Sequence, residues 1–261
     1  MGELIRQLLI ICPFIFLAGF VDSIAGGGGV ISLPTYLFAG LPAHLAAGTN
    51  KFAMCLGTTM ASVNYLRAKK VHLQVALFSV VGAFIGSAIG ARTALFVSEE
   101  VLKNIMLIVL PIVAVFMLLK DKIFNRRRLK ETALTEQISL SGKKVAVLSL
   151  VIGLVIGVYD GMIGPGTGTF LILAYSWFLG MDLVTGSGCA KLCNLASNVA
   201  ALIVYLIGGK VVFAIGIPAA ICAILGNFVG SKLAIKGGAK YIRIVMILVF
   251  VLLFVKFLIP S

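Results

Sequence analysis

Long apolar runs, separated by short polar or glycine-rich stretches, make up almost the whole chain. These runs fall at about 4–24, 30–40, 44–66, 72–97, 101–119, 144–163, 168–180, 183–206, 211–234 and 241–259. Most of them reach the roughly 20 residues that an α-helix needs to cross a bilayer. The runs at 30–40 and 168–180 are shorter, and each follows a glycine-rich break. The pattern predicts an all-α integral membrane protein with broken or re-entrant helices at these two places.

The same order of runs occurs twice, and the two copies agree in sequence. At one offset, Asp22, Gly26 and Gly28 match Asp160, Gly164 and Gly166. After a two-residue insertion, Gly40, Gly48, Lys51, Tyr65, Lys70, Gly86 and Gly90 match Gly180, Gly188, Lys191, Tyr205, Lys210, Gly226 and Gly230. An ordered series of this length is not expected by chance. We therefore predict a first membrane repeat at 1–119, a cytoplasmic linker at 120–143 and a second membrane repeat at 144–261.

The basic residues indicate how the repeats are oriented, because Lys and Arg accumulate in cytoplasmic loops. Five crossings per repeat, or three crossings plus a re-entrant hairpin, both invert the second copy. With the linker in the cytoplasm, 15 of the 22 basic residues then lie on that side: three at 67–70, eight at 120–144 and four at 232–243. A parallel arrangement would place the last group outside. The sequence thus predicts two inverted repeats of about five hydrophobic segments each, a recurrent build of secondary transporters.

Composition supports a membrane protein and argues against other classes. Hydrophobic residues make up 61% of the chain and charged residues 12%, too few polar groups to cover a soluble domain of this length. A net charge of +13 could indicate a nucleic-acid partner, but the basic residues sit in short runs between apolar segments, so we expect none. The five cysteines lie in apolar stretches without metal-ligand spacing, so we expect neither a metal nor a cofactor. The N-terminal apolar run has features of a signal peptide, but we expect it to remain as a mature helix.

The two glycine-rich breaks are the first candidate site. Short segments after such breaks, at matching places in two repeats, point to a transport site. Helices beginning at Val30 and Thr169 would present their positive N-terminal ends to an anion, so we interpret the breaks as an anion cradle. The alternative is close helix packing, for which membrane proteins often use glycine. The candidate binding residues at the breaks are Gly26, Gly27, Gly28, Gly29, Gly164, Gly166, Thr167 and Gly168.

Charged residues inside the apolar runs are the second candidate. Lys51 and Lys191 occupy equivalent places, and a lysine within a membrane helix indicates a functional site by default. The alternative is that each side chain snorkels to the interface. Asp22 and Asp160 precede the breaks and could carry a coupling proton, pair with the lysines or cap the glycine turn. The polar residues expected to help the lysines bind an anion are Thr49, Asn50, Ser187, Asn194 and Asn198.

An intramembrane enzyme is the competing class of function. It would need a nucleophile with its base, or a metal set. The sequence contains neither a His-Glu-x-x-His nor a Gly-x-Ser-x-Gly motif. We therefore predict that the protein is not an enzyme.

Two motifs resemble the sulfite exporter TauE/SafE family. They are Asp22-Ser-Ile-Ala-Gly-Gly-Gly-Gly-Val-Ile-Ser-Leu-Pro34 followed by Gly48-Thr-Asn-Lys51, and Asp160-Gly-Met-Ile-Gly-Pro-Gly-Thr-Gly-Thr169 followed by Lys191-Leu-Cys-Asn194. The likeness covers nearly the whole chain. It implies a multi-pass permease of the inner membrane for small sulfur-containing or organic anions, such as sulfite, sulfoacetate or other sulfonates. Export is the expected direction. An uptake permease, an anion channel or a non-transporting scaffold are alternatives, and a homodimer is one option for assembly.

Overall fold

The computed structural model describes residues 2–109, 112 and 142–258, with side chains up to Gly237. All regular structure in these residues is helical, so the all-α prediction is confirmed. Most of the predicted linker at 120–143 lies outside the described residues. The helices are α1 (Gly2–Ala25), α2 (Gly29–Phe38), α3 (Ala43–Arg67), α4 (Leu73–Phe96), α6 (Gly142–Met162), α7 (Thr167–Leu179), α8 (Leu183–Ile207) and α9 (Phe213–Leu258). Residues 99–109 are also helical.

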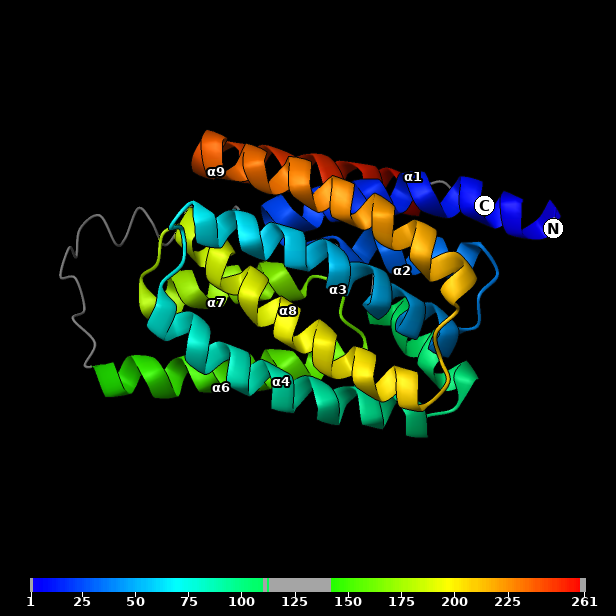
Figure 1. Cartoon of the computed structure of the whole chain (residues 1–261), viewed down its shortest axis with the longest axis horizontal. Helices are drawn as coiled ribbons and strands as arrows, with labels where there is room; N and C mark the ends of the chain where they lie inside the picture. The colour runs from blue at the N-terminus through cyan, green and yellow to red at the C-terminus, as the bar shows by residue number, and fades with distance from the viewer. Residues whose placement is uncertain (1, 110–111, 113–141, 259–261) are drawn as a thin grey trace.

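Five segments are long and apolar enough to cross a membrane: α1, α4, α6, α8 and Phe213–Gly237 of α9. The protein is therefore a multi-pass membrane protein. Helices α2 and α7, with 10 and 13 residues, are shorter than a span, as their sequences predict. The runs predicted at 211–234 and 241–259 both lie in α9, where helical structure continues along the chain, and the later, red part of α9 runs back toward the end of the molecule where α9 begins (Figure 1). Gly237 and Gly238, which lie between the runs, tolerate helical backbone angles as well as turns.

The helices lie mostly along one long axis, and pairs from the two predicted repeats pack side by side (Figure 1). Helix α1 packs along α9 and α4 along α6, while α3 packs on α9 and α8 on α4. Glycines allow this close approach. A Cβ at Gly86 or Gly90 of α4 would lie 2.2 or 2.0 Å from a carbonyl oxygen of α6, and one at Gly226 or Gly230 of α9 would lie 2.1 or 2.3 Å from a carbonyl oxygen of α1. A methyl group at any of these positions would force the two backbones apart.

The chain reverses direction at both glycine breaks, so α2 runs back along α1 and α7 back along α6 (Figure 1). A Cβ at Gly28 would lie 2.4 Å from the carbonyl oxygen of Ala18, ten residues earlier in α1. Gly26, Gly164 and Gly166 have φ of +77°, +89° and +79°, which residues with a side chain rarely adopt. The short helices begin at Gly29 and Thr167, one and two residues before the predicted starts. These reversals bring the ends of α1 and α6 together in the interior.

Candidate functional site

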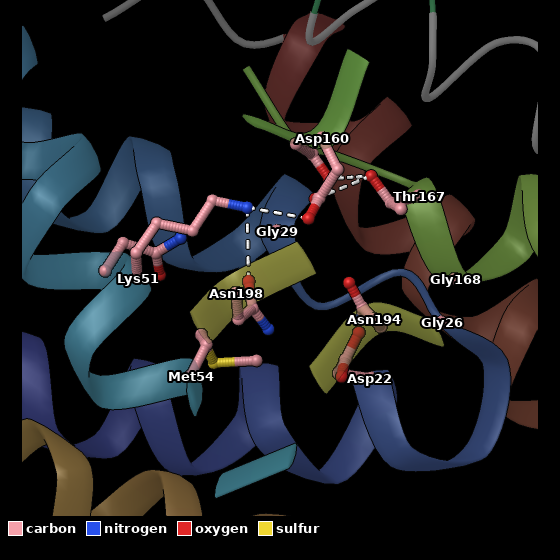
Figure 2. Close-up of a pocket in the computed structure, with 12 residues that line it drawn as sticks. Asp22, Gly26, Gly29, Lys51, Met54, Asp160, Thr167, Gly168, Asn194 and Asn198 are labelled. Atoms are coloured by element: carbon pink, nitrogen blue, oxygen red, sulfur yellow. Dashed lines mark hydrogen bonds and ion pairs between the residues drawn. The ribbon is translucent and has the colours of Figure 1, made fainter. Parts of the chain in front are cut away.

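Lys51 of α3 forms an ion pair with Asp160 of α6. Its Nζ donates to Asp160 Oδ2 at 2.8 Å and to Asn198 Oδ1 at 3.1 Å, as the dashed lines in Figure 2 show. The lysine is only 5% exposed, so it does not snorkel to the surface. A buried ammonium is tolerated when it is paired and hydrogen-bonded, and both conditions are met here.

Lys191 of α8 forms the equivalent pair with Asp22 of α1. Its Nζ donates to Asp22 Oδ2 at 2.7 Å, and the whole residue is inaccessible to solvent, with 0% exposure. Snorkelling is excluded for this lysine as well. Each lysine therefore pairs with the aspartate of the other predicted repeat. Of the three roles that the sequence left open for Asp22 and Asp160, pairing with the lysines is the one found in the structure.

The two aspartates differ in their other contacts. Asp160 accepts a hydrogen bond from Thr167 Oγ1 at 2.8 Å through Oδ1 and one from Ser197 Oγ through Oδ2. Among the described residues, the Asp22 carboxylate accepts a side-chain hydrogen bond from Lys191 alone. The four charges of the two pairs nevertheless sum to zero. The site is therefore charge-compensated.

The glycine breaks contact each other directly. The amide of Thr169 donates to the carbonyl of Gly26 at 3.3 Å, and Thr169 Oγ1 donates to the carbonyl of Ala25 at 2.7 Å. A Cβ at Gly26 would lie 2.2 Å from the carbonyl carbon of Gly168, and one at Gly168 would lie 2.5 Å from the Cα of Gly26. Gly26, Gly28 and Gly168 are therefore required for backbone packing, whether or not they also serve a ligand.

A small cavity lies between the two breaks and the ion pairs (Figure 2). The centre of a water molecule can occupy about 20 Å³ of it, which is room for one or two waters. Met54 lines it without having been predicted. Eleven predicted residues complete the lining: Asp22, Gly26, Gly29, Asn50, Lys51, Asp160, Gly164, Thr167, Gly168, Asn194 and Asn198.

The cavity wall carries polar groups with unused hydrogen-bonding capacity. Asn50 Oδ1 is buried and has no partner among the described residues. Asn194 points toward the cavity beside Asp22 in Figure 2. Because the oxygen and nitrogen of an amide can exchange places by rotation, such groups can offer N–H donors to an anion.

Six predicted site residues do not line the cavity: Gly27, Gly28, Thr49, Gly166, Ser187 and Lys191. Two of them are held in structural hydrogen bonds. Thr49 Oγ1 accepts from the amide of Val212 at 3.0 Å, and Ser187 Oγ donates to the carbonyl of Leu183 at 2.7 Å. Lys191 does not line the cavity but pairs with Asp22, which does.

The internal repeat could have identified the residues that the sequence prediction missed. Met54 and Thr58 match Asn194 and Asn198 at the offset that relates the lysines, and the amide of Asn198 donates to Thr58 Oγ1 at 3.4 Å. Ser197, next to Asn198, was also missed, because no sequence pattern marks it as a site residue. Within the described residues, no three His, Cys, Asp or Glu side chains lie close enough to hold a metal ion.

Comparison with known proteins agrees with these features. The family model for "Sulfite exporter TauE/SafE" matches residues 11–257. The probable membrane transporter protein YfcA of Escherichia coli K12 is 34% identical over 94% of this chain and 87% of its own length. The probable membrane transporter protein ORF9 of a Sinorhizobium species is 35% identical over 93% of this chain and 89% of its own length. No solved structure shows significant similarity.

These relatives are named as membrane transporters, a class distinct from enzymes, and in bacteria such proteins reside in the inner membrane. The match covers both glycine breaks, both ion pairs and the cavity between them. The chain belongs to the sulfite exporter TauE/SafE family of membrane transporters.

Proposed function

We propose that this protein is a secondary transporter that exports small sulfur-containing or organic anions, such as sulfite, sulfoacetate or other sulfonates. The observation that carries the proposal is a small cavity lined by Lys51 at the meeting point of the two glycine breaks. The N-terminal ends of α2 and α7 contribute Gly29 and Thr167 to the same cavity. Asp22 and Asp160 also line the cavity, but each is paired with a lysine. With these carboxylates compensated, the two helix N-termini favour a negatively charged ligand.

We also propose that the two repeats have inverted topology, with α1–α2 and α6–α7 as re-entrant hairpins. Helices α1 and α6 run in opposite directions in Figure 1, as do α3 and α8. Contacts between the repeats are reciprocal, since a Cβ at Gly48 would lie 2.0 Å from the Lys210 carbonyl oxygen and one at Gly188 would lie 1.9 Å from that of Lys70. Both observations support a two-fold relation with an axis in the membrane plane.

Transport by alternating access follows from the size of the cavity. A sulfonate group has a sulfur and three oxygens, whereas the cavity of about 20 Å³ holds one or two waters. Binding therefore requires the repeats to move apart. Rocking of one repeat against the other is the usual way in which inverted-repeat transporters expose a central site to each side in turn.

The transport function can be tested with purified protein in liposomes. We expect saturable exchange of labelled methanesulfonate, sulfoacetate or sulfite in proteoliposomes but not in protein-free liposomes. Methanesulfonamide, a neutral analogue of methanesulfonate, should compete about ten- to a hundred-fold less well, because a hydrogen bond to a charged group contributes roughly 1.5–3 kcal/mol. Equal competition by the amide would contradict the anion site, and no exchange of any panel anion would contradict the transport function.

The inverted topology predicts the side from which engineered cysteines react with a membrane-impermeant maleimide. In a background without the native cysteines, Gly142→Cys and Lys236→Cys should be labelled from the cytoplasm and Ser98→Cys from outside. All three residues are exposed. In Figure 1, α6 begins at the end of the molecule opposite to that where α4 ends. Labelling of positions 142 and 236 from opposite sides would exclude the inverted arrangement.

A further inference from the structure

The two ion pairs have similar lysine–aspartate distances, but the two carboxylates accept different numbers of side-chain hydrogen bonds. Asp160 accepts from Lys51, Thr167 and Ser197. The carboxylate of Asp22 accepts from Lys191 alone among the described side chains. Both aspartates are only 3% exposed, so protein side chains supply most of their hydrogen bonds.

The sequence itself contains this inequality. At the offsets that relate the repeats, Thr167 corresponds to Gly29 and Ser197 corresponds to Gly57. Neither glycine has a hydroxyl group to offer, so Asp22 has no counterpart of the two hydroxyl donors that contact Asp160. The difference is therefore a property of the two repeats and not of one arrangement of rotamers.

Protonation affects the two carboxylates differently as a result. Hydrogen bonds from charged and hydroxyl donors stabilise the ionised form of a carboxylate. Protonating Asp160 would weaken the bonds from Lys51 and Ser197, and also that from Thr167 when its one hydroxyl proton points to Asp160 and not to the Gly164 carbonyl. Protonating Asp22 would weaken the bond from Lys191. Fewer side-chain donors therefore hold the Asp22 carboxylate, which, like Asp160, lines the cavity through which a proton can arrive.

The other charged and titratable groups around Asp22 come from three helices. Lys191 of α8 is its partner, and Lys51 of α3 and Asp160 of α6 line the same cavity. Tyr65 of α3 is also near, and its hydroxyl donates to the carbonyl of Ser23 at 3.0 Å. Helices α2 and α7 contain no charged residue. The charged residues of α9 with described side chains are exposed: Lys232 and Lys236.

We propose that Asp22 is the proton-coupling residue of the transporter and that Asp160 stays ionised to position Lys51. This inference rests on the proposed transport of anions. A proton from the aqueous side binds the Asp22 carboxylate and leaves Lys191 without a counter-charge beside the cavity. The anion supplies that charge, so one proton and one anion cross together. The net charge of the four side chains and the ligands is zero before and after binding.

Methanesulfonate is a suitable probe because a sulfonic acid stays singly charged between about pH 5 and pH 8. In wild-type proteoliposomes, an imposed pH gradient should drive its accumulation about tenfold per pH unit, and an imposed membrane potential should have no effect. Asp22→Asn, which keeps the shape of a protonated carboxyl but takes no proton, should reverse this pattern. Accumulation should then follow the membrane potential and ignore the pH gradient.

Asp160→Asn is the matched control. It should change the affinity for methanesulfonate by a similar factor at every pH, because Lys51 loses its partner, but it should keep the pH-gradient drive. Infrared difference spectra provide a second readout. The band of a protonated carboxyl should appear on binding in wild type and in Asp160→Asn but not in Asp22→Asn.

Asp22→Glu retains a carboxyl at this position and provides a test if Asp22→Asn does not fold. It should keep the coupling with a shifted pH midpoint.

The outcomes distinguish this inference from the function on which it rests. If wild-type protein exchanges none of the panel anions, the proposed function fails and the coupling role falls with it. If wild-type protein transports methanesulfonate but Asp22→Asn is still driven by the pH gradient, only the coupling role is wrong. Loss of the protonated-carboxyl band in Asp160→Asn would likewise assign coupling to the other aspartate.

Discussion

Replacing Lys191 by Met is expected to lower the free energy of unfolding by roughly 3–5 kcal/mol, because it leaves Asp22 as an uncompensated buried charge. The sequence alone predicts that this substitution weakens anion binding and leaves the fold largely intact. The 2.7 Å pair with Asp22 changes that expectation. Urea or thermal unfolding of the detergent-solubilised protein measures the loss.

A charge-neutral double variant separates the loss of charge balance from the loss of packing. Lys191→Met combined with Asp22→Asn removes both charges and should recover most of the stability, since replacing a whole buried pair by neutral groups is often nearly neutral. Lys103 is exposed and forms no ion pair in the described residues, so Lys103→Met should change stability by about 0.5 kcal/mol or less. A double variant as unstable as Lys191→Met alone would show that the pair does not determine the loss.

Gly26→Ala is expected to have an effect of similar size for a different reason. Gly26 has φ of +77°, which costs an L-residue about 1–2 kcal/mol. The added Cβ would also lie 2.2 Å from the carbonyl carbon of Gly168, where only backbone could yield. Overpacking of this kind typically costs roughly 1–3 kcal/mol more. The total should appear as reduced thermal stability and reduced yield of folded protein.

Gly40 is a matched control for the steric part of this prediction. It has φ of +88°, but no atom lies within 4 Å of a Cβ built there. Gly40→Ala should therefore lose only the conformational term of about 1–2 kcal/mol. If the two alanine variants are equally stable, the close contact between the glycine breaks is not needed for folding, and an anion cradle becomes the better explanation of Gly26.

The inequality of the two ion pairs bears on how an inverted-repeat transporter can couple to protons. A symmetric site would offer two equivalent carboxylates to one proton. Here the hydroxyls of Thr167 and Ser197 support Asp160, and the corresponding residues Gly29 and Gly57 cannot support Asp22. In the proposed mechanism, divergence at two small residues gives the duplicated aspartates different roles.

Several features of the fold follow from the sequence because they depend on local interactions. Apolar runs of spanning length predicted most helices within a few residues, and the paired glycine clusters predicted where the chain breaks. Lys51 and Lys191 were identified because a charge in an apolar run is conspicuous without knowledge of its neighbours. The glycine pair between the runs at 211–234 and 241–259 interrupts the apolar pattern, but the helical assignment of α9 continues through it.

Other features were decided only by tertiary structure. Lys51 and Asp160 are 109 residues apart, and Lys191 and Asp22 are 169 residues apart. No local pattern indicates that each lysine takes its partner from the other repeat, because that depends on which helix faces meet. For the same reason, sequence could not separate Thr49, whose hydroxyl accepts the amide of Val212, from the residues that line the cavity. Hydrophobic periodicity determines the helices, but the packing of distant segments determines which polar side chains share one buried space.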